Sequence, residues 1–205
     1  MMLSMKMALK KPKGTPRERI LSVASDLFYY QGYRATGINE VIEKSGVAKA
    51  TFYSHFPSKD DLGLAYLELM MEGSLAQVEN TIQSAKGPLE RYFAVMHFLE
   101  PWMLDTDFRG CGFINMVAEI SDPKNPMRKV GKDIYDKVRA RVETLINDLI
   151  TSNTKKYGHL DVKELTGEYM VAFTGAIALA GIYHDIWPVA DALNTAHRLI
   201  GHPPG

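Results

Sequence analysis

The chain of 205 residues has a single cysteine, Cys111, which excludes an intramolecular disulfide framework. One thiol is typical of proteins that fold in a reducing compartment, so we expect a cytoplasmic protein. Long apolar runs are also missing: Tyr169–Tyr183, the longest uncharged one, is shorter than the roughly 20 residues that span a bilayer. Residues 1–14 contain no apolar run typical of a signal peptide. We therefore expect a soluble protein with no membrane partner.

Motifs typical of enzymes and metal sites are missing too. The sequence contains no HExxH, no CxxC, no P-loop and no GxGxxG after a strand. The six histidines show no metal-ligand spacing, and His184-Asp185 is only a weak catalytic pair. We therefore expect no catalytic residues, no metal and no cofactor. A helical enzyme and a structural helical bundle stay as alternatives.

The chain also has no formal net charge at pH 7, because 24 Lys and Arg residues balance 24 Asp and Glu residues. The charge is nevertheless unevenly distributed. Residues 1–57 carry nine basic against four acidic side chains, and the rest of the chain carries 15 against 20. A basic first quarter on an acidic body indicates that only this end of the protein meets phosphate.

The hydrophobic pattern shows no period-two alternation, so we predict no sheet and an all-α fold. With 46% hydrophobic and 23% charged residues, the chain can bury a core. Apolar residues at helical spacing predict about nine helices, over residues 15–31, 36–45, 48–55, 58–84, 88–103, 113–120, 126–153, 162–186 and 189–200.

Local start and stop signals support the first four of these helices. Thr15 and Glu18 have the spacing of a capping box at the start of the first helix. Gly32 is expected to end that helix, since glycine readily adopts the left-handed conformation found there. Thr36 is expected to cap the second helix, and Ser58 the fourth.

Residues 38–57 have the organisation of a helix-turn-helix motif, with two short helices joined by the turn Ser45-Gly46. In such a motif the second helix enters the major groove of DNA at its N-terminal end, so the polar side chains there are candidate DNA contacts. The residues expected to contact double-stranded DNA are Thr36, Lys49, Ala50, Thr51, Tyr53, His55 and Lys59.

The chemistry of these side chains suits separate parts of a duplex. Lys49 can reach guanine O6 and N7 or a phosphate, and Thr51 offers a hydroxyl and a methyl group. Tyr53 and His55 suit the flanking backbone, where their donors bond phosphate oxygens. Lys59 can add its charge to the N-terminal dipole of the fourth helix near a further phosphate.

The segment from residue 15 to about residue 69 closely resembles the DNA-binding domain of TetR/AcrR-family transcriptional regulators. The matching residues are Arg19-Ile20-Leu21, Phe28, Gly32-Tyr33, Ile38, Val41, Ile42, Gly46-Val47, Lys49, Thr51, Phe52-Tyr53, His55-Phe56 and Lys59. One departure is Ala48, where many relatives carry Ser, which would supply an N-cap and a phosphate donor. The resemblance implies a DNA-binding domain over 15–70, preceded by a flexible basic arm over 1–14. It also implies a larger helical ligand-binding and dimerisation domain over 71–205.

Small residues recur every four positions in the stretch 172–180, and such a face lets helices approach closely. A homodimer is expected because a two-fold operator needs two paired DNA-binding domains. The residues predicted for its interface are Ala172, Gly175, Ala176, Leu179, Ala180, Ala196 and Leu199. The alternative is that the same face packs within one subunit.

Methionine and aromatic side chains in the second part of the chain are candidates for an adaptable apolar pocket. The residues predicted to line it are Tyr66, Phe93, Met96, His97, Phe98, Trp102, Cys111, Phe113, Met116 and Phe173. Plain core packing is the alternative for each of them. The identity of the small-molecule effector cannot be read from this set.

Cys111 lies between Gly110 and Gly112 at the predicted start of a helix, where a thiol can have a lowered pKa and react with oxidants or electrophiles. The alternative is a small residue that permits close packing.

Taken together, these features predict a ligand-responsive repressor that binds a near-palindromic operator as a homodimer and is released by a small molecule. A redox- or electrophile-sensing regulator that acts through Cys111 is the alternative function.

Overall fold

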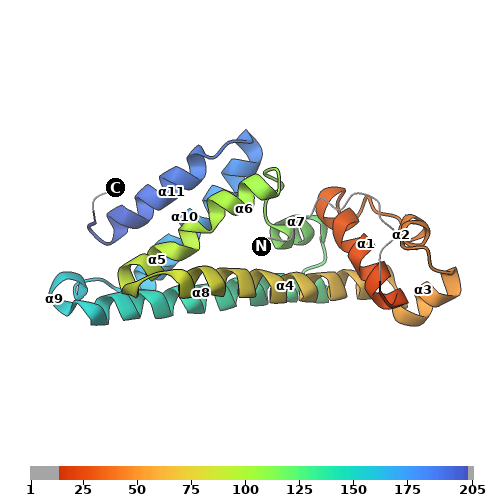
Figure 1. Ribbon diagram of the computed structural model, residues 1–205, viewed down its shortest axis with the longest axis horizontal. Coiled ribbons are helices and arrows are strands. Elements are labelled where there is room, and N and C mark those ends of the chain that lie inside the picture. The colour runs from red at the N-terminus through yellow and green to blue at the C-terminus, as the bar shows by residue number, and fades with distance from the viewer. Residues whose placement is uncertain (1–13, 203–205) are drawn as a thin grey trace. The chain divides into compact units, whose positions relative to one another are not determined.

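The computed structural model describes residues 14–202, which form eleven helices and contain no strand (Figure 1). The predicted all-α class is confirmed. The helices are α1 (Pro16–Tyr30), α2 (Ile38–Ser45), α3 (Lys49–His55), α4 (Lys59–Ser84), α5 (Gly87–His97), α6 (Leu99–Asp105), α7 (Gly112–Glu119), α8 (Pro126–Ser152), α9 (Thr154–Tyr157), α10 (Val162–Tyr183) and α11 (Trp187–Leu199). The basic arm predicted over 1–14 lies outside the described residues, apart from Gly14.

The helices group into two compact units. Among the described residues, the first unit comprises 14–72 together with Cys111–Asp133, and the second comprises Gly73–Gly110 and 134–202. Helices α4 and α8 contribute residues to both units. The expected domain boundary near residue 70 lies close to Glu72, but α7 and the first turns of α8 group with the first unit.

In the first unit, α2 and α3 each lie against α1 (Figure 1). Ile20, Ala24 and Phe28 from α1, Val41 from α2 and Phe52 from α3 are all buried. Apolar residues at helical spacing along α1 therefore form the stripe that the other two helices cover.

The capping signals of two helices are confirmed. The Glu18 amide donates to Thr15 Oγ1 over 3.3 Å, and the Thr15 amide donates to Glu18 Oε2 over 2.8 Å. The hydrogen bond from the Thr15 amide, and to a smaller extent the contact with the Thr15 side chain, hold the pKa of the Glu18 carboxyl below its ordinary value. Ser58 and Asp61 form the same reciprocal pair before α4. Gly32 follows the end of α1 with φ +103°, in the left-handed region that favours glycine.

The cap predicted for α2 is wrong. Its N-cap is Gly37, with no side-chain capping bond, and the hydroxyl of Thr36 donates to the Gly32 carbonyl over 2.7 Å. Gly32 follows directly on the end of α1, where backbone carbonyls lack helical partners, so the hydroxyl is used there and not at the start of α2.

The number of helices differs from the expected nine at two places. The helix predicted over 88–103 is divided at Phe98 into α5 and α6. Pro101 explains the break, because a proline four residues after His97 cannot donate to the His97 carbonyl and its ring crowds that carbonyl. The second difference is the short α9, which begins where the Asn153 side chain accepts the Lys156 amide.

The core of the second unit is joined by two buried tyrosines. The Tyr92 hydroxyl donates to the Ala196 carbonyl over 3.0 Å, which connects α5 to α11. The Tyr169 hydroxyl donates to the Tyr92 carbonyl over 2.9 Å, which connects α10 to α5. Burial raises the pKa of Tyr92 and that of Tyr169 above their ordinary value, so both phenols stay neutral donors at ordinary pH.

Among the described residues, one helix is long and apolar enough to cross a membrane by length and composition, namely α10. Its position in the second unit favours a packed role. Tyr169, Phe173 and Ile177 are buried, and α10 and α11 lie against each other. A helix of a soluble helical bundle can have the same composition, because its neighbours cover part of its apolar surface.

We predict that Tyr92→Phe lowers the free energy of unfolding by about 1 kcal/mol, because the Ala196 carbonyl loses a buried donor. Urea denaturation monitored by circular dichroism measures the change. Tyr183→Phe is the matched control, since Tyr183 is 58% exposed, and its effect should stay within about 0.5 kcal/mol. Equal stability of the two variants would contradict the prediction.

Candidate functional site

The turn between α2 and α3 is built around Gly46. This residue has φ +64° and ψ +34°, and its amide donates to carbonyls of the last turn of α2. A side chain at this conformation would be strained. Arg19 of α1 reaches the Gly46 carbonyl with Nη1 over 3.5 Å, so α1 also contacts the turn. The turn thereby sets the angle at which α3 leaves α2.

Helix α3 presents one apolar and one polar face. Phe52 has no exposed surface, and its ring lies edge-on to Tyr53 with centroids 5.3 Å apart. The side chains of Lys49, Tyr53 and His55 are exposed. The exposed surface of α3 therefore carries one cation, one phenol and one imidazole within two turns.

The remaining predicted contacts on α3 lie at its N-terminal end. Ala50 is exposed and Thr51 is half-buried. The N-cap is Ala48, which makes no side-chain capping bond, so the first turn of α3 has no side chain over its amides. These amides can therefore add donors near a phosphate, without competition from a cap.

Lys59 lies beside the motif at the start of α4 and is more enclosed than a free surface lysine. Its ammonium group is 4.5 Å from the centre of the Tyr33 ring. Burial lowers the pKa of Lys59, and the carboxylates of Glu119 and Asp60 act in the opposite direction. Its charge is held at the ring, next to the first turn of α4.

Thr36 does not join this surface. Its side chain is 1% exposed, and its hydroxyl donates to the Gly32 carbonyl. The prediction of a DNA contact by Thr36 is corrected accordingly, because its polar atoms are directed into the protein.

Glu119 supports the segment before the motif and is not among the residues predicted from the sequence. This residue ends α7, and its carboxylate accepts the amides of Tyr33 and Arg34 between α1 and α2. No local signal predicts the pairing, because the partners are 85 and 86 positions apart.

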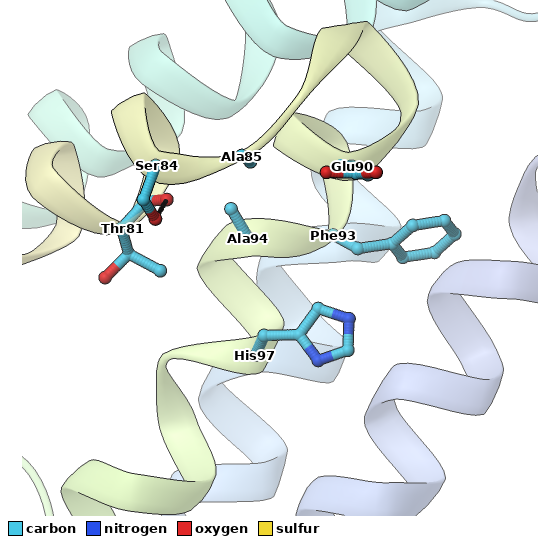
Figure 2. Close-up of a pocket in the computed structure, with 7 residues that line it drawn as sticks. All are labelled: Thr81, Ser84, Ala85, Glu90, Phe93, Ala94 and His97. Carbon is cyan, nitrogen blue, oxygen red and sulfur yellow. Dashed lines mark hydrogen bonds between the residues drawn. The ribbon is translucent and has the colours of Figure 1, made fainter.

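A separate cavity of about 340 Å³ lies in the second unit (Figure 2). Thr81, Ser84 and Ala85 line it from the end of α4, and Glu90, Phe93, Ala94 and His97 line it from α5. Figure 2 shows the rings of Phe93 and His97 on the same side of α5. The Phe93 ring also stacks on His197 of α11, with centroids 4.0 Å apart.

Only two of the ten predicted pocket residues, Phe93 and His97, line this cavity. The others divide between the units. Tyr66, Cys111, Phe113 and Met116 belong to the first unit, whereas Met96, Phe98, Trp102 and Phe173 belong to the second. Thr81 and Ser84 were not predicted to line a pocket, because Thr and Ser on the last turn of a helix are usually exposed to solvent.

Cys111 is the N-cap residue of α7 and is partly exposed, without a side-chain capping bond. Its neighbour Gly112 is tightly packed, since a Cβ there would lie 2.6 Å from Met70 Cε and 2.9 Å from the Tyr66 hydroxyl. The glycine therefore serves close packing, while the thiol keeps some access to solvent.

The predicted dimer residues lie on two different faces. Ala176, Ala180 and Ala196 are almost completely buried between helices of the same subunit. Their assignment to an intersubunit interface is wrong, because no surface is left for a partner to cover. Ala172, Gly175 and Leu199 are half-buried, and Leu179 is 40% exposed.

A different set of large apolar side chains on α10 and α11 is exposed. Val171 and Ile182 are each 74% exposed, and Tyr183 and Trp187 are 58% and 42% exposed. Gly175 adds open space between them, because a Cβ there would meet nothing within 4 Å. Apolar residues gathered on one surface are typical of an interface with another protein.

A basic N-terminal segment, a left-handed glycine turn and a short helix with an outward polar face together define a helix-turn-helix DNA-binding protein. Comparison with known proteins gives the family. The model of the family described as "Bacterial regulatory proteins, tetR family" matches residues 20–66. The chain belongs to the TetR/AcrR family of transcriptional regulators, which are not enzymes.

Individual relatives extend beyond the DNA-binding segment. The transcriptional regulator LmrA of Bacillus subtilis is 32% identical over 124 residues, which cover 60% of this chain and 66% of LmrA, just under two thirds of its length. The transcriptional repressor NemR of Escherichia coli is 24% identical over 91% of this chain and 94% of NemR. The crystal structure of SCO4454, a TetR-family regulator from Streptomyces coelicolor, superposes with a TM-score of 0.78. It is 28% identical and covers 91% of this chain and 94% of its own.

We predict that Lys49→Ala and Tyr53→Ala each weaken operator binding about 10-fold to 100-fold, because each variant removes a base or phosphate contact. Electrophoretic mobility shift with a duplex selected by the wild-type protein measures the affinity. Lys86→Ala, an exposed lysine of the second unit, is the control and should leave the affinity unchanged. Wild-type affinity of both folded variants would rule out α3 as the reading helix.

Proposed function

We propose that this regulator is a repressor that binds a near-palindromic operator as a homodimer and leaves it when a small molecule binds. The observation that carries the DNA-binding part is the outward polar face of α3, which follows the left-handed turn at Gly46. Each subunit would place residues 48–55 in one half-site. Because it acts on DNA, the protein would work in the cytoplasm.

The side chains of α3 have distinct roles in this proposal. Lys49 and Ala50 at its N-terminal end face the base edges, together with Thr51. Tyr53 and His55, one turn further along, donate to phosphate oxygens on either side. Lys59 contributes its charge from the start of α4, although its position over the Tyr33 ring favours a phosphate contact over a base contact.

The exposed apolar face of α10 and α11 supports the dimer. Val171, Ile182 and Trp187 would be covered by the same residues of a second copy, as a two-fold interface requires. Two copies joined in this way can present two reading helices to half-sites roughly 34 Å apart. The small residues of α10 remain necessary, but their role is to bring α11 close within each subunit.

The cavity between α4 and α5 supports the effector part of the proposal. Phe93 offers an apolar wall, and Thr81, Glu90 and His97 offer polar groups that can orient a small molecule. Helix α4 is continuous from Lys59 to Ser84, so a ligand at its last turn acts on the helix that begins beside α3. Release requires that the effector bind the DNA-free arrangement more tightly than the DNA-bound one.

An electrophile-sensing regulator is the second candidate. The observation that favours it is the partly exposed thiol of Cys111 at the N-terminal end of α7. The packed surroundings of Gly112 favour the structural role of this segment, so small-molecule release stays the first proposal.

The experiment that tests DNA binding is the affinity for the protein's own upstream DNA at several salt concentrations. We predict a steep loss of affinity with salt, because bound lysines displace counterions from phosphates. Lys59→Ala should reduce the log–log slope by about one unit, because one phosphate contact is lost. Lys86→Ala should leave the slope unchanged, and a salt-independent wild type would refute the DNA-binding proposal.

We predict that Ile182→Asp shifts the protein from dimer to monomer, since a charge would be buried at the centre of the proposed interface. Analytical ultracentrifugation measures the shift as at least a tenfold rise in the dimer dissociation constant. Thr144→Asp places the same charge on an exposed position of α8 and should leave the dimer intact. A dimer of wild-type strength in the Ile182→Asp variant would exclude this face.

A further inference from the structure

Glu119 makes two backbone contacts that connect α7 to the DNA-binding helices. Its Oε1 accepts the Tyr33 amide over 3.1 Å, and its Oε2 accepts the Arg34 amide over 2.6 Å. Both amides belong to the segment between α1 and α2. Each carboxylate oxygen therefore holds one donor, and such charge-assisted bonds are shorter and stronger than neutral ones.

The shape of the α1–α2 segment makes this contact possible. Gly32 has φ +103°, and a Cβ there would lie 3.0 Å from Glu119 Oε1. A larger residue at position 32 would thus be strained and would also crowd the carboxylate. Successive amides that point to one side form a concave anion site, and here the protein's own Glu119 occupies it.

A second set of contacts joins the same parts of the first unit. The Tyr33 hydroxyl donates to Asp60 Oδ1 at the start of α4, and the Lys59 ammonium lies over the Tyr33 ring. Asn125 Nδ2, just before α8, donates to Asp60 Oδ2 over 3.4 Å. Burial raises the pKa of Tyr33, and the bond to Asp60 raises it further, so the phenol remains a donor.

The end of α7 is itself held in place. Arg128 Nη1 donates to the Val117 carbonyl over 3.0 Å and to the Ile120 carbonyl over 2.8 Å. Gly131 of α8 packs on Val117, since a Cβ there would lie 2.6 Å from Val117 Cγ2. The backbone on both sides of Glu119 is thus held by contacts with α8.

We propose that Glu119 is a positioning residue for DNA reading and links the position of α7 to that of α3. The segment that it holds leads directly into α2, whose left-handed turn sets the direction of α3. A displacement of α7, which follows its N-cap Cys111 and buries Phe113 and Met116, therefore moves the anchor of the reading helix. This inference rests on the proposed function. It adds a second connection to the DNA-binding helices, through α7, to the one that α4 provides.

The variants that test it are Glu119→Gln and Glu119→Ala, with Glu72→Gln as the matched control. Glu72 is an exposed residue of α4 in the same unit. Glutamine keeps the size of the side chain, but only one of its two terminal atoms is an acceptor, and its NH₂ group would face the other amide donor. Glu119→Gln therefore remains informative if Glu119→Ala fails to fold.

The first readout is hydrogen–deuterium exchange at the amides of Tyr33 and Arg34. We predict exchange at least about tenfold faster in Glu119→Gln than in wild type, because a charge-assisted bond is lost. Glu72→Gln should exchange at the wild-type rate. Unchanged exchange at both amides in Glu119→Gln would show that the carboxylate does not hold this segment and would overturn the inference.

The second readout separates positioning from mere stability. Duplexes selected with the wild-type protein are altered by insertion or removal of one or two base pairs between the half-sites. Glu119→Gln should lose at least about tenfold in affinity for the selected duplex and should discriminate less between the spacings. Faster exchange with unchanged affinity and spacing preference would mean a structural role only and would overturn the inference.

The failure of the inference can be told apart from the failure of the proposed function. If the wild-type protein selects no duplex, the proposed function itself fails. If the wild type binds and Glu119→Gln binds equally well, only the role of Glu119 is refuted.

Discussion

Burial of the Phe52 ring is the constraint on which the DNA-reading surface depends. The ring has no exposed area and lies with Ile20 and Val41 in the core of the first three helices. In a helix of seven residues, one side chain held in the core fixes the rotation of the helix about its axis, and in this orientation Lys49 and Tyr53 are exposed. Removal of a buried phenylalanine costs about 3–5 kcal/mol, more than any exposed ion pair contributes. Apolar packing therefore supplies most of the free energy that holds α3 against the other two helices.

Polar contacts between distant parts of the chain complete the first unit. Glu119 and Asn125 follow the first three helices by many residues, yet they bond to Tyr33, Arg34 and Asp60. The unit thus contains α7 and the first turns of α8 as well as the DNA-binding helices. Because carboxylate-to-amide bonds depend strongly on distance and direction, this arrangement is more sensitive to the position of α7 than apolar packing alone would be.

The second unit solves a different packing problem. The small residues of α10 let α11 approach closely, and the buried Ala176, Ala180 and Ala196 lie in this contact. The larger apolar residues Val171 and Ile182 are left on the surface. The same helix therefore has one face that completes the subunit and another that favours a partner. The cavity of this unit is formed separately, by α5 and the end of α4.

The sequence by itself determined the all-α class and the helix-turn-helix, because helical periodicity, caps and the glycine turn act over a few neighbouring residues. The family followed from the resemblance of the residues between Arg19 and Lys59. Local signals correctly predicted the helix caps Thr15 and Ser58. They failed at Thr36, because its hydroxyl donates to the nearby carbonyl of Gly32. Only the tertiary structure decided that Glu119 holds the Arg34 amide, 85 residues away, and which face of α10 stays exposed. Periodicity shows that a helix has an apolar face, but the neighbour that covers it is chosen by the packing of the whole chain.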